Sequence, residues 1–101
     1  MHIITKKRLS DAARKYPNAK SKIAFWYAVA KAATWINLVE TRKSFRHADQ
    51  VSVKSDRTVT IFNLSNDHRL ITAIHYNRKK IFILLILTHA EYDKGKWKEN
   101  L

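Results

Sequence analysis

The 101-residue chain has no cysteine, one glycine and one proline. Without cysteine it cannot form disulfides, thiolate metal sites or a cysteine nucleophile, which fits a reducing, cytoplasmic location. Glycine and proline are too scarce for flexible linkers, so we expect a single domain over residues 1–101. Residues 1–17 have no apolar segment of a secretory signal. The longest apolar run, residues 81–87, is far shorter than the roughly 20 residues of a membrane-spanning helix.

Acidic residues are also few. Twenty Lys and Arg against eight Asp and Glu give a formal net charge of +12. The basic residues occur all along the chain rather than in a tail, which favours binding to a polyanion. Nucleic acid is the first expectation and an acidic protein partner the second. A basic surface that only keeps the protein in solution is the simplest alternative.

The hydrophobic pattern changes near residue 49. Before it, helical spacing predicts a helix over residues 6–16 capped by Thr5, a second over residues 19–34 and a short helical turn within residues 35–45. After it, strand-like runs are predicted at residues 50–54, 58–63, 69–76 and 81–88. The run at residues 81–87 does not alternate, so we expect a central strand covered on both faces.

These elements together predict an α+β domain. Two N-terminal helices would pack on an antiparallel sheet of about three to four strands, and a short helical turn would close the chain.

Polar side chains gather where the last two predicted strands meet. With Arg78 and Lys79 at the centre of the turn, antiparallel pairing places Arg69 opposite Thr88, beside His89. The same end of the sheet then carries a guanidinium, an imidazole, a phenol and several ammonium groups. RNA cleavage needs such groups: a base for the 2′-hydroxyl, cations for the extra negative charge and an acid for the departing oxygen.

Six segments form a pattern that spans nearly the whole chain. They are Met1-His2-Ile3-Ile4, Phe45-Arg46-His47-Ala48-Asp49-Gln50-Val51, Ile61-Phe62-Asn63-Leu64, His68-Arg69-Leu70-Ile71, Thr88-His89-Ala90-Glu91-Tyr92-Asp93-Lys94-Gly95 and Trp97-Lys98. The pattern resembles the HigB toxins of bacterial toxin–antitoxin pairs, which have the RelE/ParE-like fold. The resemblance implies an endoribonuclease, or mRNA interferase, that cleaves translated mRNA in the ribosomal A site beside ribosomal RNA. It also implies a HigA-type helix-turn-helix antitoxin, and no metal or small-molecule cofactor.

Carried over residue by residue, the resemblance implies that Arg69 binds the scissile phosphate. His89 and Tyr92 would transfer protons, with base and acid unassigned, and Lys94 would assist electrostatically. We expect further contacts to RNA or the ribosome from Lys54, Arg57, His68, Lys96 and Lys98. No pair of histidines has the HxH or HxxxH spacing of a metal site, so none is predicted.

Simpler interpretations stand beside these roles. Tyr92 and Trp97 would also serve as packing residues, and His68 as a structural or solvent-facing one. Glu91 and Asp93 diverge on a helix or turn, so they are expected to balance nearby lysines or cap the last turn rather than act together. Two rival functions also remain: a basic ribosome- or nucleic-acid-binding protein without catalysis, and a ParE-like gyrase poison.

Overall fold

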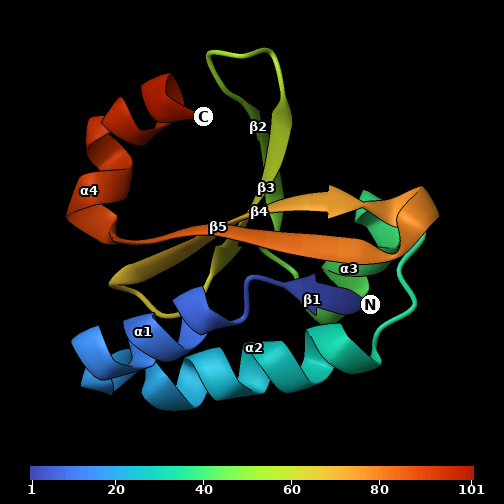
Figure 1. Cartoon of the computed structure of the whole chain (residues 1–101), viewed down its shortest axis with the longest axis horizontal. Helices are drawn as coiled ribbons and strands as arrows, with labels where there is room; N and C mark the ends of the chain where they lie inside the picture. Colours follow the sequence, from blue (N-terminus) through green and yellow to red (C-terminus); the bar gives the residue numbers. More distant parts are fainter.

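The computed structural model describes residues 1–101 and is built around a five-stranded sheet with the strand order β1-β5-β4-β3-β2 (Figure 1). Strand β1 pairs with β5 in parallel, and the other neighbours are antiparallel. The elements are β1 (His2–Ile4), α1 (Lys7–Lys15), η1 (Pro17–Ala19), α2 (Lys20–Ala32), α3 (Leu38–Ser44), β2 (Asp49–Ser52), β3 (Thr58–Asn63), β4 (His68–His75), η2 (Tyr76–Arg78), β5 (Lys80–Thr88), α4 (His89–Lys94) and η3 (Lys96–Asn100). The predicted α+β class is confirmed. None of the helices has the length and apolar character needed to cross a membrane.

One face of the sheet, which we call the helix face, is covered by α1 and α2 (Figure 1). Its core contains 14 buried residues, and bulky rings dominate one end of it. Phe62 of β3 lies 5.3 Å from the ring of Trp26 and 6.2 Å from that of Trp35, and Phe45 contacts all three rings. Such aromatic packing buries a large apolar area, so this face holds most of the core.

The opposite face, which we call the open face, has a much smaller core of five buried residues. Strand residues Val59, Ile61 and Ile71 form its floor, and Trp97 of η3 lies on them. Helix α4 and η3 fold back beside the sheet (Figure 1), and this path places the indole ring of Trp97 against the strands. Further apolar side chains, among them Leu85 and Leu87 of β5, are only partly buried against this small core.

The N-terminus differs from the prediction. A fifth strand, β1, pairs with residues 80–82 of β5, so the sheet is mixed and not purely antiparallel. Three residues are too few to show an alternating pattern, which is why β1 was not predicted. Thr5 does not cap α1, because its φ of 68° is far from the extended backbone of an N-cap residue. The N-cap is Lys6, and it makes no side-chain capping bond.

Strand β5 is central along only part of its length. Ile81 and Ile83 are buried, but Leu84 to Thr88 are half-buried, so the expectation of a strand covered on both faces is wrong for its second half. The reason is the short β1, whose pairing with β5 ends at Phe82. Beyond that point one edge of β5 has no neighbouring strand.

The β4–β5 register also differs from the prediction. The connection is the η2 turn followed by Lys79 in a left-handed conformation, with a φ of 54°, so His75 pairs with Lys80. A bulge then leaves Leu84 without a partner, and Arg69 pairs with Leu87. The predicted pair of Arg69 and Thr88 is therefore wrong by one residue, and the two side chains lie on opposite faces.

Arg8 of α1 stabilises this bulge. Its Nη1 atom donates hydrogen bonds of 2.9 Å to the carbonyl oxygens of both Ile83 and Leu84. A bulge leaves ladder groups unpaired, and the guanidinium supplies a donor for them.

Candidate active site

Arg69 stands on the open face in a cross-strand row. Asn63 of β3 is its partner on one side and Leu87 of β5 on the other. Antiparallel partners point to the same face, and Ile71, two residues along β4, belongs to the open-face core. The row therefore places a guanidinium beside an amide at the end of the sheet where α4 begins.

The turn between β3 and β4 holds the Arg69 side chain. Its Nη1 atom donates to the carbonyl oxygens of Ser65 at 2.8 Å, His68 at 3.1 Å and Asn66 at 3.4 Å. Nε and Nη2 make no hydrogen bond within the chain, and no carboxylate is paired with the group. One nitrogen thus fixes the guanidinium, and the others remain free for the planar fork that suits a phosphate.

His68, next in the sequence to Arg69, lies on the helix face. Only 9% of it is exposed, and its ring packs 4.6 Å from the ring of Tyr16. Its Nδ1 atom is 3.1 Å from the hydroxyl of Ser65. The predicted contact of His68 with RNA is not supported by this position, because adjacent strand residues point to opposite faces and His68 is the one turned inward.

Helix α4 starts with a capping box. The Thr88 hydroxyl accepts from the Glu91 backbone N–H, and the Glu91 carboxylate accepts from the Thr88 backbone N–H. The Glu91 carboxylate also accepts from the Thr88 hydroxyl at 3.0 Å, and the bonds that it accepts from the Thr88 N–H and, second, from this hydroxyl lower the pKa of Glu91 below its usual value. Gly95, with a φ of 74°, ends the helix in the left-handed conformation that glycine tolerates best. Glu91 therefore caps the first turn and not the last, whereas the expected balance with nearby lysines is present, because Lys15 and Lys94 also lower its pKa.

His89 projects from the first turn of α4 and is exposed. Its backbone N–H donates to the Asp67 carbonyl at 2.6 Å, which ties α4 to the β3–β4 turn. Its Nε2 atom lies 3.2 Å from a carboxylate oxygen of Asp93, one helical turn further on. Asp93 thus pairs with an imidazole and not with a lysine, and the two acidic residues of α4 act separately, as predicted from their spacing. A carboxylate partner at this distance orients the imidazole ring.

Tyr92 lies three residues after His89, so both side chains project from neighbouring positions on α4. Its ring stacks on Trp97 with centroids 5.4 Å apart and an interplanar angle of 19°, and the indole N–H donates to the Tyr92 carbonyl at 3.0 Å. Burial raises the pKa of Tyr92, and the carboxylate of Asp49 raises it further, whereas Arg69 opposes the shift. The first two effects favour the neutral, protonated phenol.

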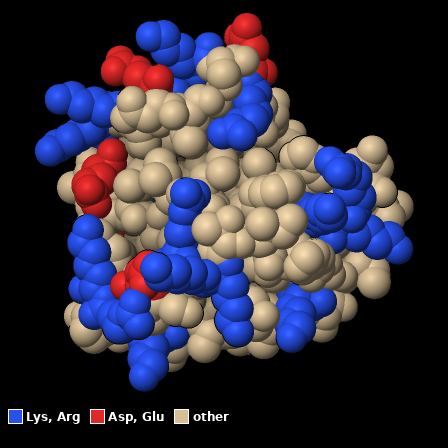
Figure 2. Space-filling model, in the orientation of Figure 1, with Lys and Arg blue, Asp and Glu red and all other residues tan.

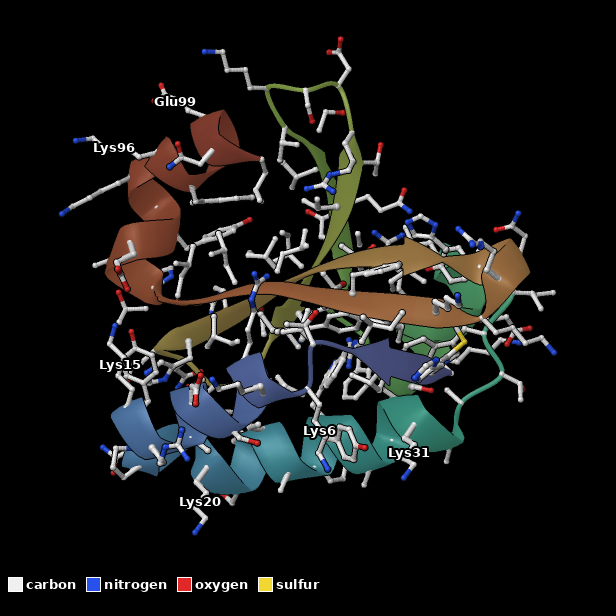
Figure 3. All side chains as sticks on the ribbon, in the orientation of Figure 1. Lys6, Lys15, Lys20, Lys31, Lys96 and Glu99 are labelled. Carbon is white, nitrogen blue, oxygen red and sulfur yellow. The ribbon has the colours of Figure 1, made fainter.

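The predicted lysines take different positions. Lys94 is exposed in the last turn of α4, and the Lys98 ammonium lies 5.7 Å from the centre of the Trp97 ring. Lys96 projects away from the sheet with Glu99 (Figure 3). Lys54 and Arg57 are exposed at the tip of the β2–β3 hairpin. The Lys54 N–H donates to the Lys98 carbonyl at 3.1 Å, so this tip lies beside η3.

Sequence reasoning missed two residues of the open face. Asn63 enters the site as the strand partner of Arg69, and Asp49 enters through the pairing of β2 with Ile61. Both lie in segments that carry the family resemblance, but only the strand register places them near Arg69 and Tyr92. Asn63 also borders a small pocket with Arg46 and His47.

Charge on the surface is mainly positive. In the view of Figure 2, Lys and Arg side chains greatly outnumber Asp and Glu. The structure holds no group of three or more His, Cys, Asp or Glu side chains placed to bind a metal ion. What this part of the molecule does offer is a guanidinium with unused donors, an imidazole paired with a carboxylate, and a phenol.

An α+β domain that groups an arginine, a histidine and a tyrosine beside a basic surface has the make-up of a small RNA-directed toxin. A family model described as "HigB_toxin, RelE-like toxic component of a toxin-antitoxin system" matches residues 19–95. The chain belongs to this family.

Curated relatives agree with this assignment. The chain is 34% identical over 94 residues to "mRNA interferase HigB" of Escherichia coli O6:H1, covering 93% of this chain and 90% of that one. It is 33% identical over 96 residues to "mRNA interferase toxin HigB" of E. coli K12 and to "mRNA interferase HigB" of Shigella flexneri, covering 92% of this chain and 88% of each relative.

Proposed function

We propose that this chain is the mRNA interferase of a toxin–antitoxin pair, an endoribonuclease that cleaves translated mRNA and so inhibits translation. The curated relatives carry that name and are matched over most of their length. The observation that carries the proposal is the geometry of Arg69, which is fixed by one nitrogen and free at the others. A guanidinium held in this way is pre-organised for the phosphate of an RNA backbone.

The proposed reaction uses the 2′-hydroxyl of the substrate as nucleophile. His89, paired with Asp93, removes the 2′-proton as this oxygen attacks the adjacent phosphorus. The bond from phosphorus to the 5′ oxygen breaks, and Tyr92, whose pKa is raised, gives its proton to that oxygen. The products are a 2′,3′-cyclic phosphate and a 5′-hydroxyl, and Arg69 stabilises the charge that develops between them.

Basic side chains around the open face support RNA binding in this proposal. Lys94 and Lys98 stabilise negative charge near α4, and Lys54 and Arg57 contact the backbone of mRNA or ribosomal RNA from the hairpin tip. Lys96 points away from the sheet and is assigned to the ribosome. The substrate is mRNA in the ribosomal A site, the partner is a HigA-type helix-turn-helix antitoxin, and the location is the cytoplasm.

The decisive experiment is expression of an Arg69→Ala/His89→Ala double variant. We expect it to relieve growth arrest and to remove the new 5′ ends that primer extension detects on cellular mRNA. Lys22→Ala, a change at an exposed lysine on α2, is the matched control and should leave both effects in place. A folded double variant that keeps full toxicity would rule out the assigned site.

The same assays separate the rival functions. A binding protein without catalysis would slow growth and leave no new 5′ ends. A ParE-like toxin would inhibit supercoiling by purified gyrase, which an mRNA interferase should leave unaffected.

A further inference from the structure

A small polar pocket lies where the chain passes from α3 into β2, beside the last residue of β3. It has a volume of about 190 Å³, and it is lined by Ser44, Phe45, Arg46, His47, Ala48 and Asn63. Pockets for drug-sized ligands have volumes of roughly 300–1,000 Å³, so this one suits a single ring system with its substituents. None of the residues that line it is acidic.

Contacts within the chain hold the pocket in shape. The Ser44 hydroxyl accepts a hydrogen bond of 3.0 Å from the Trp35 indole, and the Phe45 ring packs among the aromatic rings of the helix-face core. The Ala48 N–H donates to the Phe45 carbonyl at 3.0 Å, and the Ala48 carbonyl accepts from Arg42 Nε at 2.8 Å. The pocket is therefore pre-organised, which lowers the cost of ordering it around a ligand.

Three side chains of the pocket have no partner inside the chain. The Arg46 guanidinium, the His47 imidazole and the Asn63 amide are exposed, and none of them makes a hydrogen bond or an ion pair. The nearest acidic residue in the sequence, Asp49, is already engaged, because its carboxylate lies 3.5 Å from Arg42 Nη2. A cation, a flat ring and an amide together match the phosphate, the face and the edge of a nucleotide.

The pocket adjoins the candidate active site through Asn63. Asn63 and Arg69 lie directly opposite one another on β3 and β4, and the Cα atoms of such a pair are about 5 Å apart. An RNA strand whose scissile phosphate lies on Arg69 would therefore bring a neighbouring nucleotide to the pocket.

We propose that this pocket binds the nucleotide next to the scissile phosphate and sets the base preference of cleavage at that position. Asn63 reads the edge of the base, because its amide offers both a donor and an acceptor. His47 stacks on the base, and Arg46 binds the phosphate. The role in cleavage rests on the proposed function, but binding of a nucleotide in the pocket does not.

Small probes added to the full chain test the pocket without ribosomes. The probes are the four common ribonucleoside 5′-monophosphates and ribose 5-phosphate, which has no base, each titrated while nuclear magnetic resonance follows the signals of the chain. We expect the mononucleotides to shift the backbone amides of residues 46–48 and the side-chain amide of Asn63. At least one of them should bind about tenfold more tightly than ribose 5-phosphate, because stacking on the base adds to the phosphate contact. Equal affinity for all five probes would overturn the proposal, as would shifts that occur only elsewhere in the chain.

Variants separate the pocket from the rest of the basic surface. Asn63→Ala should remove most of the difference among the four mononucleotides and leave binding of ribose 5-phosphate nearly unchanged. Arg46→Ala should weaken all five probes by a similar factor, since each carries a phosphate. Lys22→Ala, which removes a charge on α2 outside the pocket, and Arg69→Ala should leave the shifts at residues 46–48 in place. Loss of these shifts in Arg69→Ala would show that the probes bind at Arg69 and not in the pocket.

Maps of cleaved mRNA test the role in base preference. Relative to the unaltered chain, Asn63→Ala should relax the preference at one position beside the cut, whereas Arg69→Ala should lower cleavage at every site. A uniform loss with unchanged preference in Asn63→Ala would overturn the role in selection. Cleavage of mRNA without binding of any mononucleotide would overturn the pocket alone. Binding in the pocket without any cleavage of mRNA would contradict the proposed function, and with it the role in base preference.

Discussion

The two faces of the sheet differ in how they use the same strands. The helix face buries a cluster of 14 residues under α1 and α2, and the Trp26 Nε1 atom is its one buried side-chain polar atom without a hydrogen-bond partner. The open face buries five, and at its edge Arg69 and Asn63 are left accessible. His68 and Arg69 show the contrast within one dipeptide: the first packs on Tyr16, and the second keeps free donors.

This difference shows that the residues that contribute most to stability and the candidate catalytic arginine lie on different faces of the sheet. A large core on one face allows the other face to keep Arg69 and Asn63 accessible at its edge. Mutations on the two faces should therefore affect different measurements.

The largest effect is expected at Phe62. Replacement by Ala removes a ring that contacts three other aromatic rings in the helix-face core, so the free energy of unfolding should fall by about 3–5 kcal/mol. Urea unfolding followed by circular dichroism measures it. Trp97→Ala in the smaller core should cost about 2 kcal/mol, since η3 can detach without opening the helix face. An equal loss of unfolding free energy in the two variants would contradict the difference between the two faces.

Arg69→Ala should lower mRNA cleavage about 100-fold, because it removes the group that stabilises the charge of the transition state. Arg69→Lys should recover only part of this loss, since an ammonium has no planar fork. His68→Ala is the neighbouring control. It should leave cleavage nearly unchanged and lower the free energy of unfolding by about 1–2 kcal/mol, because it empties a packed position. A catalytic defect in a well-folded His68→Ala variant would contradict the division between the faces.

These contrasts also show how far the sequence alone could predict the structure. The strongly patterned β3 and β5 and the two long helices were predictable from local spacing. The register at Arg69 was not, because it depends on the left-handed Lys79 and on a bulge held by Arg8, which is distant in sequence from Ile83.

The residues of the candidate site also differ in whether the sequence alone could indicate them. Arg69 and the residues of α4 were indicated by their chemistry. Asn63 and Asp49, as well as the burial of His68, follow from strand pairing, which a shift of one residue would reverse.

Thr88→Ala should have a smaller effect. It removes the side chain of the capping box and should cost about 1 kcal/mol. The loss is confined to the start of α4, so hydrogen exchange should speed up in residues 89–94 and not in α2. Thr88→Ser keeps the hydroxyl and should restore the slower exchange. Acceleration spread evenly over both faces would show that α4 is not an independent unit.

The smallest effect concerns pH. The pKa of Tyr92 is raised above its ordinary value of 10.0, first by burial, so folding favours the neutral phenol. Its contribution to stability is fully present below about pH 10 and is lost as pH rises through the higher pKa of the folded state.

Tyr92→Phe should flatten this decline in unfolding experiments over that pH range. Burial also raises the pKa of Tyr76, which packs against the helix-face core, so part of the decline should persist in the variant. An unchanged profile would show that Tyr92 titrates as it does in the unfolded chain.

The parallel pairing of β1 with β5 has a consequence for the time at which a newly made copy becomes harmful. His2 pairs with Lys80, which is synthesised much later, and α4 with His89 and Tyr92 is made later still. A growing chain therefore carries Arg69 well before it can close its sheet or assemble the rest of its site. The candidate site therefore cannot be complete on a growing chain before α4 has been synthesised.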